Sequence, residues 1–248
     1  MLNDIILPME SAIYKTVILK ISGEAIGNPN SSSILDKNKL LNIANLIKNL
    51  TENGIRIGVV CGAGNIFRGR IASEAGVDPI DGDYMGMVGT VINCKAISSV
   101  LNKVGVKNIL FGALEVEDVA VKYSPEKARI CLDNGFVCLF SGGTGKPTVT
   151  TDSCAAKRAL EIGADAILAG KNGVTGVFDK DQNKFSDAKF LKNLTYKEAL
   201  EKNIKVMDEL AMRVLENSDV VVRVFSMEDI DNFRKVIFGE KIGSTISK

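Results

Sequence analysis

Residues 55–69 read IRIGVVCGAGNIFRG, a mainly apolar run that leads directly into a glycine-containing turn. An apolar run of this length that is bounded by a turn indicates a buried strand, and the small residues after it indicate a tight connection to a helix. Similar apolar runs recur along the chain. They predict strands at residues 15–21, 55–61, 108–111, 136–140, 166–169 and 220–225.

Helical patterns alternate with these runs. After the first strand, apolar residues recur at helical spacing from Leu40 to Leu50, and Gly54 ends that helix. A long amphipathic segment spans 85–101, and shorter helices are expected at 125–134, 153–162, 196–201, 208–217 and 228–238. The alternation predicts an α/β fold, a three-layer α/β/α sandwich around a central, mainly parallel sheet. Ligands of such a sheet bind at the carboxyl ends of its strands.

The composition excludes several classes of function. The net charge is +1, so no field attracts nucleic acid or a membrane, and neither is expected as a partner. The chain has no His, which excludes a His general base, a Ser-His-Asp triad and a His metal site. Its five Cys include no CxxC pair and are expected to be buried and reduced, as in a cytoplasmic protein. No apolar run reaches transmembrane length, and residues 1–14 are interpreted as an N-terminal extension rather than a signal peptide.

The first predicted strand ends in a short motif of Lys20, Ile21, Ser22, Gly23 and Glu24. The glycine would let backbone N–H groups approach a phosphate, and the Lys adds a mobile positive charge. Taken alone, this motif is more typical of an ordinary strand end with a turn glycine.

The turn after the second strand contains Ala63, Gly64 and Arg68. Small residues before a helix leave N–H groups free for an anion, and an Arg can bind a phosphate with two donors. Arg68 and Gly69 stand where a dinucleotide fingerprint has its third Gly, so an NAD site is not expected. A tight turn without a ligand explains this stretch equally well.

Residues 141–153 read SGGTGKPTVTTDS, with three Gly, four Thr and two Ser. This density of hydroxyl and amide donors suits a phosphate, a ribose or a base edge. Pro147 follows Gly145 and Lys146, so the stretch is not a Walker A loop. Asp152 stands where the next helix begins, so its simpler role is that of an N-cap, which is compatible with a role in orienting Lys20.

Residues 171–181 read KNGVTGVFDKD. The two Gly form a mobile turn, and Phe178 could cover an apolar base edge, although a surface loop with one packed Phe is the simpler interpretation of this stretch alone. Four such loops follow predicted strands, and a doubly wound sheet gathers them at one edge. Together they favour a nucleotide crevice and phosphoryl transfer.

Five motifs resemble those of bacterial uridylate kinases, which have the amino acid kinase fold. They are KISGE at 20–24, GAGNIFRG at 62–69, GDYMGM at 82–87, GTGKPTVTTDS at 143–153 and KVMD at 205–208. The resemblance runs from about residue 15 to the C-terminus, which implies one domain over 15–248.

The resemblance implies transfer of the ATP γ-phosphoryl group to UMP, in pyrimidine nucleotide biosynthesis, with Mg²⁺ held mainly by the phosphates. It implies that Lys20 and Arg68 neutralise the transferring group and that Asp152 holds Lys20. Implied UMP contacts are Ala63, Asp83, Thr144, Gly145, Lys146, Pro147, Thr148, Val149, Thr150 and Thr151. Implied ATP contacts are Lys20, Ile21, Ser22, Gly23, Gly64, Arg68, Asn172, Phe178 and Asp181.

Members of this family are typically homohexamers regulated by GTP and UTP, so a homohexamer with UTP feedback inhibition is expected. The loop at 25–33 is shorter than the loop that mediates GTP activation, and GTP activation is therefore not expected. Ala63 stands where Gly is usual, and it costs about 1 kcal/mol if the position needs a positive φ. Lys146, Thr175 and Gln182 also replace a usual Asn, Asp and Pro.

Two other functions remain open. One is a kinase of the same fold that acts on aspartate, glutamate or carbamate, and the Thr-rich loop and Asp83 argue against it. The other is a nucleotide-binding storage or regulatory protein, and Lys20, Arg68 and Asp152 argue against that. Phosphoryl transfer to UMP needs no general base, because its phosphate oxygen is already anionic near neutral pH.

Overall fold

The computed structural model describes residues 11–28, 33–182 and 184–248. In these residues nine strands form one sheet in the order β4-β3-β5-β2-β1-β6-β10-β11-β9, and only β11 runs antiparallel to its neighbour β10. The central strands are β5 (Val137–Ser141), β2 (Arg56–Cys61), β1 (Thr16–Ile21), β6 (Ala166–Lys171) and β10 (Val221–Ser226). The outer strands are β4 (Val121–Lys122), β3 (Asn108–Gly112), β11 (Ser244–Ser247) and β9 (Asn193–Thr195).

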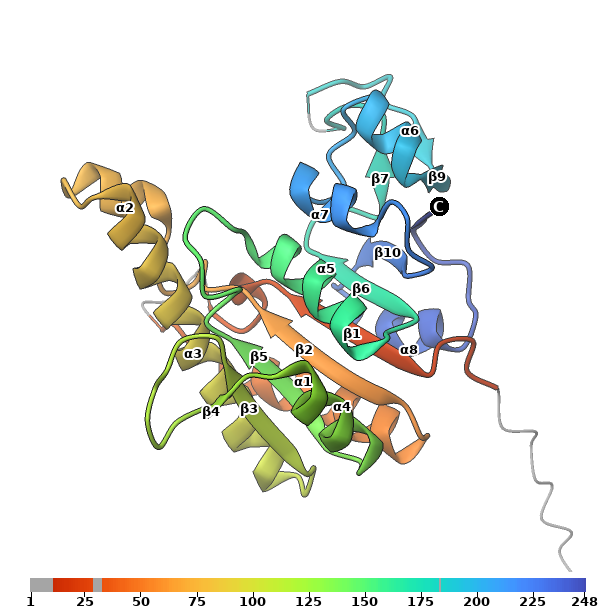
Figure 1. Ribbon diagram of the computed structural model, residues 1–248. Coiled ribbons are helices and arrows are strands. Elements are labelled where there is room, and N and C mark those ends of the chain that lie inside the picture. Colours follow the sequence, from red (N-terminus) through yellow and green to blue (C-terminus); the bar gives the residue numbers. More distant parts are fainter. Residues whose placement is uncertain (1–10, 29–32, 183) are drawn as a thin grey trace, which may run out of the picture.

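Helices cover both faces of this sheet (Figure 1). On one face lie α1 (Lys37–Glu52), α3 (Pro79–Lys103) and α8 (Asn232–Ile237). On the other lie α4 (Pro125–Asp133), α5 (Thr151–Ile162), α6 (Tyr196–Glu201) and α7 (Glu209–Leu215). The remaining elements are the 3₁₀ turn η1 (Gly23–Ala25), α2 (Gly69–Glu74) and a two-stranded ribbon of β7 (Val177–Phe178) and β8 (Phe190–Leu191).

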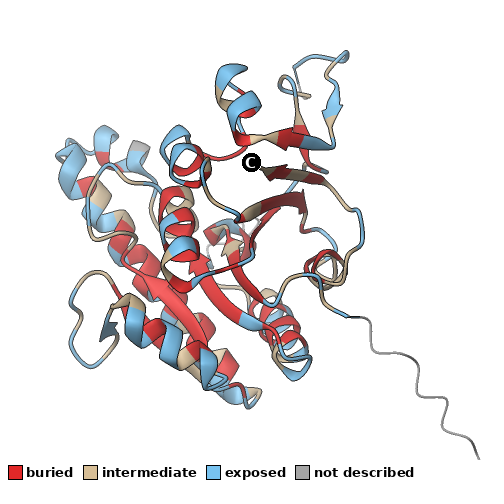
Figure 2. Ribbon diagram, turned by 45° about the vertical axis from the view of Figure 1, so that its right-hand side comes forward, coloured by how far each residue is buried: buried red, intermediate tan, exposed pale blue. Residues whose placement is uncertain are grey.

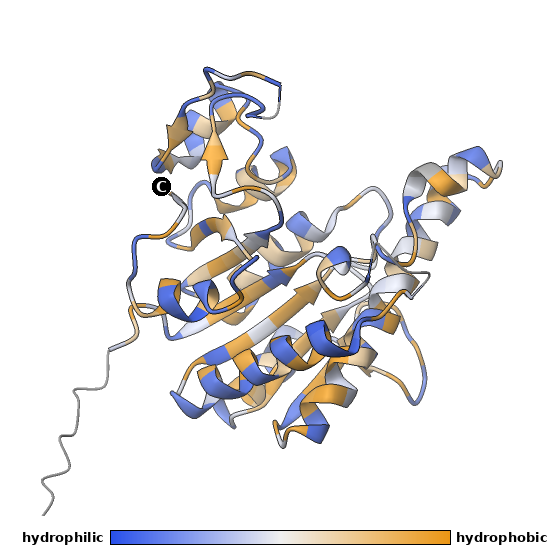
Figure 3. Cartoon of the chain, turned by 180° about the vertical axis from the view of Figure 1, so that it is seen from behind, coloured by the Kyte–Doolittle hydropathy of each residue, from blue (hydrophilic) through white to orange (hydrophobic). Residues whose placement is uncertain are grey.

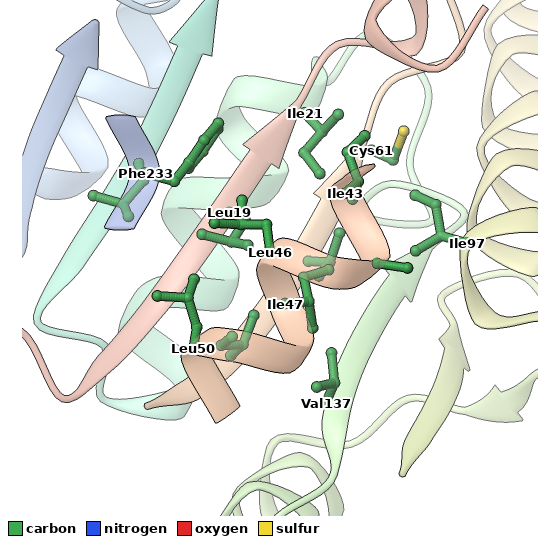
Figure 4. Close-up of a cluster of buried hydrophobic side chains, with 14 of the residues drawn as sticks. Leu19, Ile21, Ile43, Leu46, Ile47, Leu50, Cys61, Ile97, Val137 and Phe233 are labelled. Carbon is green, nitrogen blue, oxygen red and sulfur yellow. The ribbon is translucent and has the colours of Figure 1, made fainter. Parts of the chain in front are cut away.

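The sheet separates two hydrophobic cores because successive strand residues point to opposite faces. On β1, Leu19 and Ile21 pack towards α1, whereas Ile18 packs towards α5. Figure 4 shows the first core, where Leu19, Ile47 and Ile97 come from a strand and two helices. Figure 2 shows that the central strands are buried while the outer turns of the helices are exposed. The five cysteines form no disulfide. Four of them are buried as expected, whereas Cys131 is only partly buried.

The structure confirms the predicted α/β architecture. All six expected strands are present, and their observed bounds differ from the predicted ones by no more than two residues. Short elements were not predicted. Strand β11 consists of Ser244, Thr245, Ile246 and Ser247, which do not form an apolar run, and β4, β7 and β8 have two residues each. Helix α2 carries no strong apolar repeat and was also missed.

Helix α3 is long and apolar, although no apolar run of transmembrane length is expected from the sequence. Within the described residues it is the one helix with the length and mean hydropathy of a membrane span, but half of its most apolar stretch is buried inside the protein. Its buried side packs on α1, β3 and β5. Figure 3 shows that the hydrophobic residues concentrate in the sheet between the helical layers. We therefore interpret α3 as a core helix.

Candidate active site

Four glycine-containing loops meet at the carboxyl edge of the sheet, because β5, β2, β1 and β6 are adjacent and parallel. The loops after β1 and β2 touch closely at Gly23. A Cβ atom on Gly23 would lie 2.3 Å from Asn65 Oδ1 and 2.8 Å from the Gly64 nitrogen. Only glycine fits this approach.

The Lys20 ammonium lies 2.7 Å from Asp152, and both side chains are largely buried, with 18% and 22% exposure. Lys20 is near the end of β1, and Asp152 is in the first turn of α5. The N-cap of α5 is Thr150 rather than Asp152, which corrects the sequence-based expectation. Thr150 Oγ1 accepts hydrogen bonds from the Asp152 and Ser153 N–H groups at 3.1 and 3.3 Å. The Asp152 carboxylate is therefore available to Lys20.

The Thr-rich loop, residues 142–150, is held by helix α3. The Thr148 N–H donates to Asp83 at 2.7 Å, and the Gly142 N–H donates to Thr90 Oγ1 at 2.8 Å. Three glycines in the loop and Thr148 have positive φ angles, so the chain turns tightly. Thr144 Oγ1 is buried and has no partner in the described part of the chain. Such a buried polar atom is costly unless a ligand or water reaches it.

A hollow of about 280 Å³ lies between the Thr-rich loop, the turn after β2 and α3. We call it the α3 hollow. It gathers seven of the residues to which the resemblance gives nucleotide contacts. They are Ala63, Gly64, Asp83, Lys146, Val149, Thr150 and Thr151. Thr144, Gly145, Pro147 and Thr148 belong to the same loop without lining the hollow.

Two further hollows meet at Lys171, and Lys20 lines neither these two nor the α3 hollow. One, of about 440 Å³, is bordered by the β7–β8 ribbon, including Phe178 and Asp181, and we call it the ribbon hollow. The other, of about 650 Å³, is bordered by Asp152 and residues 203–208, and we call it the 203–208 hollow. The two hollows share Lys171, Asn203, Ile204 and Lys205. Asn172 is exposed and lines neither of them.

Lys171 lies at the junction of these two hollows. Its ammonium donates to the Val206 carbonyl at 2.7 Å. Burial lowers its pKa, the charge of Lys20 acts in the same direction, and Asp152 acts against both. Sequence reasoning gave Lys171 no role. Its position could have indicated a role, because Lys171 is the last residue of a buried strand, β6, and ligands bind at the carboxyl ends of such strands. Lys20 is similarly placed, one residue before the end of β1.

Asp208 joins the Thr-rich loop to α7. It accepts hydrogen bonds from Thr150 Oγ1, from Ser153 Oγ at 2.8 Å and from the Ala211 N–H at 2.9 Å. Burial alone would raise the pKa of Asp208, but the bonds from Thr150, Ala211 and Ser153 outweigh burial and lower it. Sequence reasoning used Asp208 only as part of a motif, because its two partners lie more than fifty residues away.

Arg68 is placed differently from Lys20. Its guanidinium pairs with Glu24, and its Nε donates to the Gly64 carbonyl at 3.2 Å. The Arg68 side chain is 61% exposed, so the ion pair with Glu24 is weak and easily exchanged. The structure thus holds Arg68 at the rim of the site, apart from the Lys20–Asp152 pair.

Ala63 carries no backbone strain. It is not among the residues with positive φ in the described chain, so the cost considered for this substitution does not arise. Its methyl group lies against Gly89 of α3, where an added Cβ would come within 2.8 Å of it.

The described residues contain no group of three or more His, Cys, Asp or Glu side chains arranged to hold a metal ion. The acidic groups nearest the centre have other partners, since Asp152 pairs with Lys20 and Asp208 with hydroxyls. The site is therefore a set of cations, amides and hydroxyls, which suits a polyanionic ligand.

The chain matches the amino acid kinase family model over residues 15–226. It therefore belongs to the amino acid kinase family.

The relatives with which it aligns include uridylate kinases. It is 42% identical to the uridylate kinase of Mycoplasma capricolum over 234 residues, which cover 94% of this chain and 98% of that relative. It is 41% identical to the uridylate kinase of Mesoplasma florum, again over 94% of this chain and over 97% of that relative. The solved UMP kinase structure from Bacillus anthracis matches with a TM-score of 0.91 and 35% identity, covering 94% and 96% of the two chains. The resemblance to bacterial uridylate kinases is thereby confirmed.

Proposed function

We propose that this protein transfers the γ-phosphoryl group of ATP to UMP and forms UDP. The relatives named uridylate kinase or UMP kinase support this function over most of the chain. The observation that carries the proposal is the position of the Lys20–Asp152 pair. Thr151 borders the α3 hollow, and the next residue, Asp152, borders the 203–208 hollow. Two ligand spaces therefore meet at neighbouring residues, and the Asp152 carboxylate holds the Lys20 ammonium at 2.7 Å there.

In this proposal UMP occupies the α3 hollow, with its ribose at Asp83 and its phosphate towards Ala63, Gly64 and Lys20. ATP occupies the ribbon hollow and the 203–208 hollow, with its base at Phe178 and its phosphates towards Lys171 and Lys20. Lys20 stabilises the negative charge that develops between the two nucleotides, and Asp152 fixes its ammonium. Arg68 leaves Glu24 to reach the phosphates.

The attacking group is an oxygen of the UMP phosphate, which is anionic near neutral pH and loses no proton. The absence of His from the chain therefore carries no penalty. Mg²⁺ would be held mainly by phosphate oxygens, since the described residues offer no three-ligand acidic cluster. It would neutralise phosphate charge when bound.

An ADP-release assay with different acceptors tests the proposal. Turnover is expected with UMP, weaker turnover with CMP, and none with aspartate, glutamate or carbamate. Turnover with a small acid but not with UMP would replace the proposal by another kinase of the same fold. Binding of UMP without any turnover would favour a storage or regulatory protein.

We also propose that the protein assembles as a homohexamer through helix α3. Ile80, Tyr84, Val88 and Ile92 recur every four residues and are each at least 40% exposed. Residues at this spacing share one helix face, and an apolar face of this kind is stabilised when a second copy covers it. Figure 1 shows that α2 and the first turns of α3 project beyond the sheet.

Val88→Glu should reduce the mass measured by light scattering, whereas Ile130→Glu on exposed α4 should not. An unchanged mass for Val88→Glu would exclude this interface.

Three further proposals complete this function. Residues 15–248 form one domain, supported by the single sheet that runs from β1 to β11. The protein acts in the cytoplasm, supported by its five unpaired cysteines. UTP inhibits it by competing for the α3 hollow, and GTP does not activate it. Residues 29–32 of the loop at 25–33 lie outside the described residues. So do residues 1–10, which make up most of the N-terminal extension.

A further inference from the structure

A hollow of about 380 Å³ lies away from the proposed active site, beside β10, β11 and β9, with Ile13 and three basic residues in its lining. None of its lining residues borders the other three hollows. Its floor is a row across three strands, because Arg223 is in register with Thr245, and Thr245 with Asn193. Residues in register point to the same face of a sheet, so three hydrogen-bonding side chains line one surface. We call this space the β11 hollow.

The guanidinium of Arg223 has no charged partner among residues 11–28, 33–182 and 184–248. The residue is only 5% exposed. It donates to the Ile242 and Glu240 carbonyls at 2.9 and 3.4 Å and to the Tyr14 hydroxyl at 3.5 Å, all neutral acceptors. Its Nε is buried and has no acceptor within the described chain. A buried cation without an anion is costly to fold.

Two more cations stand at the rim of the β11 hollow. Lys192 and Lys241 are exposed lining residues, and neither ammonium forms an ion pair within the described ranges. The nearby Glu240 does not line the hollow, and its charge acts on Lys235, whose pKa is raised mainly by Asp229. As far as the structure describes the chain, the lining therefore contains three cations and no carboxylate. Their mutual repulsion falls when an anion enters.

We propose that the β11 hollow binds a small phosphate-bearing anion, such as a diphosphate group. Arg223 supplies a guanidinium charge and an Nε donor without an acceptor in the described chain, the two Lys supply point charges, and Asn193 and Thr245 supply neutral hydrogen bonds. The volume lies near the lower limit of small-molecule sites, which suits a diphosphate or a compact phosphorylated metabolite. This site is independent of the proposed transfer of phosphate to UMP.

Lysine footprinting of the full chain tests the site directly. The protein is acetylated with and without pyrophosphate at constant ionic strength, and the rate at each Lys is measured by mass spectrometry. At ten times the dissociation constant, about 90% occupancy should slow the labelling of Lys192 and Lys241 by about tenfold. Lys103 and Lys127, which lie outside all four hollows, should be unaffected. If pyrophosphate changed the labelling rate by the same factor at all four Lys, the proposal would be overturned.

A charge-matched pair of variants provides the second measurement. Lys192→Glu/Lys241→Glu and Lys103→Glu/Lys127→Glu change the net charge equally. Any binding of pyrophosphate at the proposed active site should stabilise both variants equally. The proposal requires a smaller rise in melting temperature for the first variant. An equal rise would mean that Arg223 only holds the turn at 239–243. If Lys192 and Lys241 become reactive only after residues 1–10 are removed, the hollow is filled by the chain itself and the proposal is wrong.

Discussion

The Thr-rich loop and the β7–β8 ribbon border neighbouring hollows, but they are held in different ways. Polar bonds fix the loop from two sides, through Asp83 of α3 and Asp208 before α7. The ribbon is held by its two-residue strands, by Ser244 of β11, which hydrogen-bonds to Val177 and Leu191, and by the edge-to-face contact of Phe178 and Phe190, with ring centres 5.5 Å apart. Under the proposed function, the loop would contact a ligand with many polar groups, and the ribbon would contact the flat apolar face of a base.

This difference suggests that the two regions contribute differently to binding of the acceptor and of the donor. Directional bonds at the loop select one acceptor geometry, whereas an aromatic contact at the ribbon tolerates small shifts of the donor. Lys20 and Lys171 lie between the two regions. Variants on each side should therefore separate effects on UMP from effects on ATP.

The largest expected effect comes from Lys20→Ala, at the boundary itself. The variant should lower kcat by about 10²–10³-fold, because the charge that develops in transfer loses its buried cation. UMP binding, measured by calorimetry, should survive, since the contacts of the α3 hollow remain. Lys48→Ala, on the surface of α1, is the matched control. An unchanged kcat in Lys20→Ala would refute the role of Lys20.

The next effect is that of Lys171→Met, which keeps the volume of the side chain and removes its charge. A charge-assisted hydrogen bond contributes about 1.5–3 kcal/mol, so the KM for ATP should rise by about 10–100-fold. The KM for UMP should change little. Lys197→Met on exposed α6 is the control. Equal changes in both KM values would mean that Lys171 only supports the 203–208 segment.

Asp208→Asn tests the polar bonds of the Thr-rich loop. Weaker bonds to Thr150 and Ser153 should lower the free energy of unfolding by about 1 kcal/mol near pH 7 and raise the KM for UMP. Because Asp208 also borders the 203–208 hollow, the KM for ATP should rise too, but by less. A larger effect on ATP would contradict the division between the two regions.

The same variant predicts a pH dependence. The pKa of Asp208 is lowered below 3.8 by folding. Its contribution to stability is therefore complete above the unfolded value and is lost as the pH falls through the folded value. The difference in free energy of unfolding between wild type and Asp208→Asn should stay constant from pH 8 to 5 and shrink below about pH 4. Denaturation by urea at each pH measures it, and a constant difference down to pH 3 would exclude this assignment.

The smallest effect is expected for Phe178→Ala on the ribbon. Loss of one aromatic contact costs about 0.5–1.5 kcal/mol, so the KM for ATP should rise by about 2–12-fold, with UMP unaffected. Phe178→Leu keeps an apolar contact and should show less of this effect. A change in the KM for UMP as large as that for ATP would show that the ribbon also shapes the acceptor side.

The same contrast explains how far the sequence predicts this molecule. The central strands are long and apolar, so periodicity located them, and the four loops after them followed from the topology of a parallel sheet. The Thr-rich loop was recognisable by composition. The partners that fix it were not, because Asp208 lies more than fifty residues from Thr150 and its bonds exist only in the folded chain. Asp152 was taken for an N-cap because Thr150, two residues earlier, is an equally good capping residue.

Ala63 and Gly89 have a consequence for how this site can change. The methyl group of Ala63 fills the space that Gly89 leaves open on α3, and a methyl group at both positions would bring two carbons within 2.8 Å. The contact between the turn after β2 and helix α3 therefore has room for only one methyl group from these two positions. With glycine at position 63, a larger residue would fit at position 89. With alanine at position 63, as in this chain, position 89 must be glycine. These two positions should consequently vary together, in steps of one methyl group.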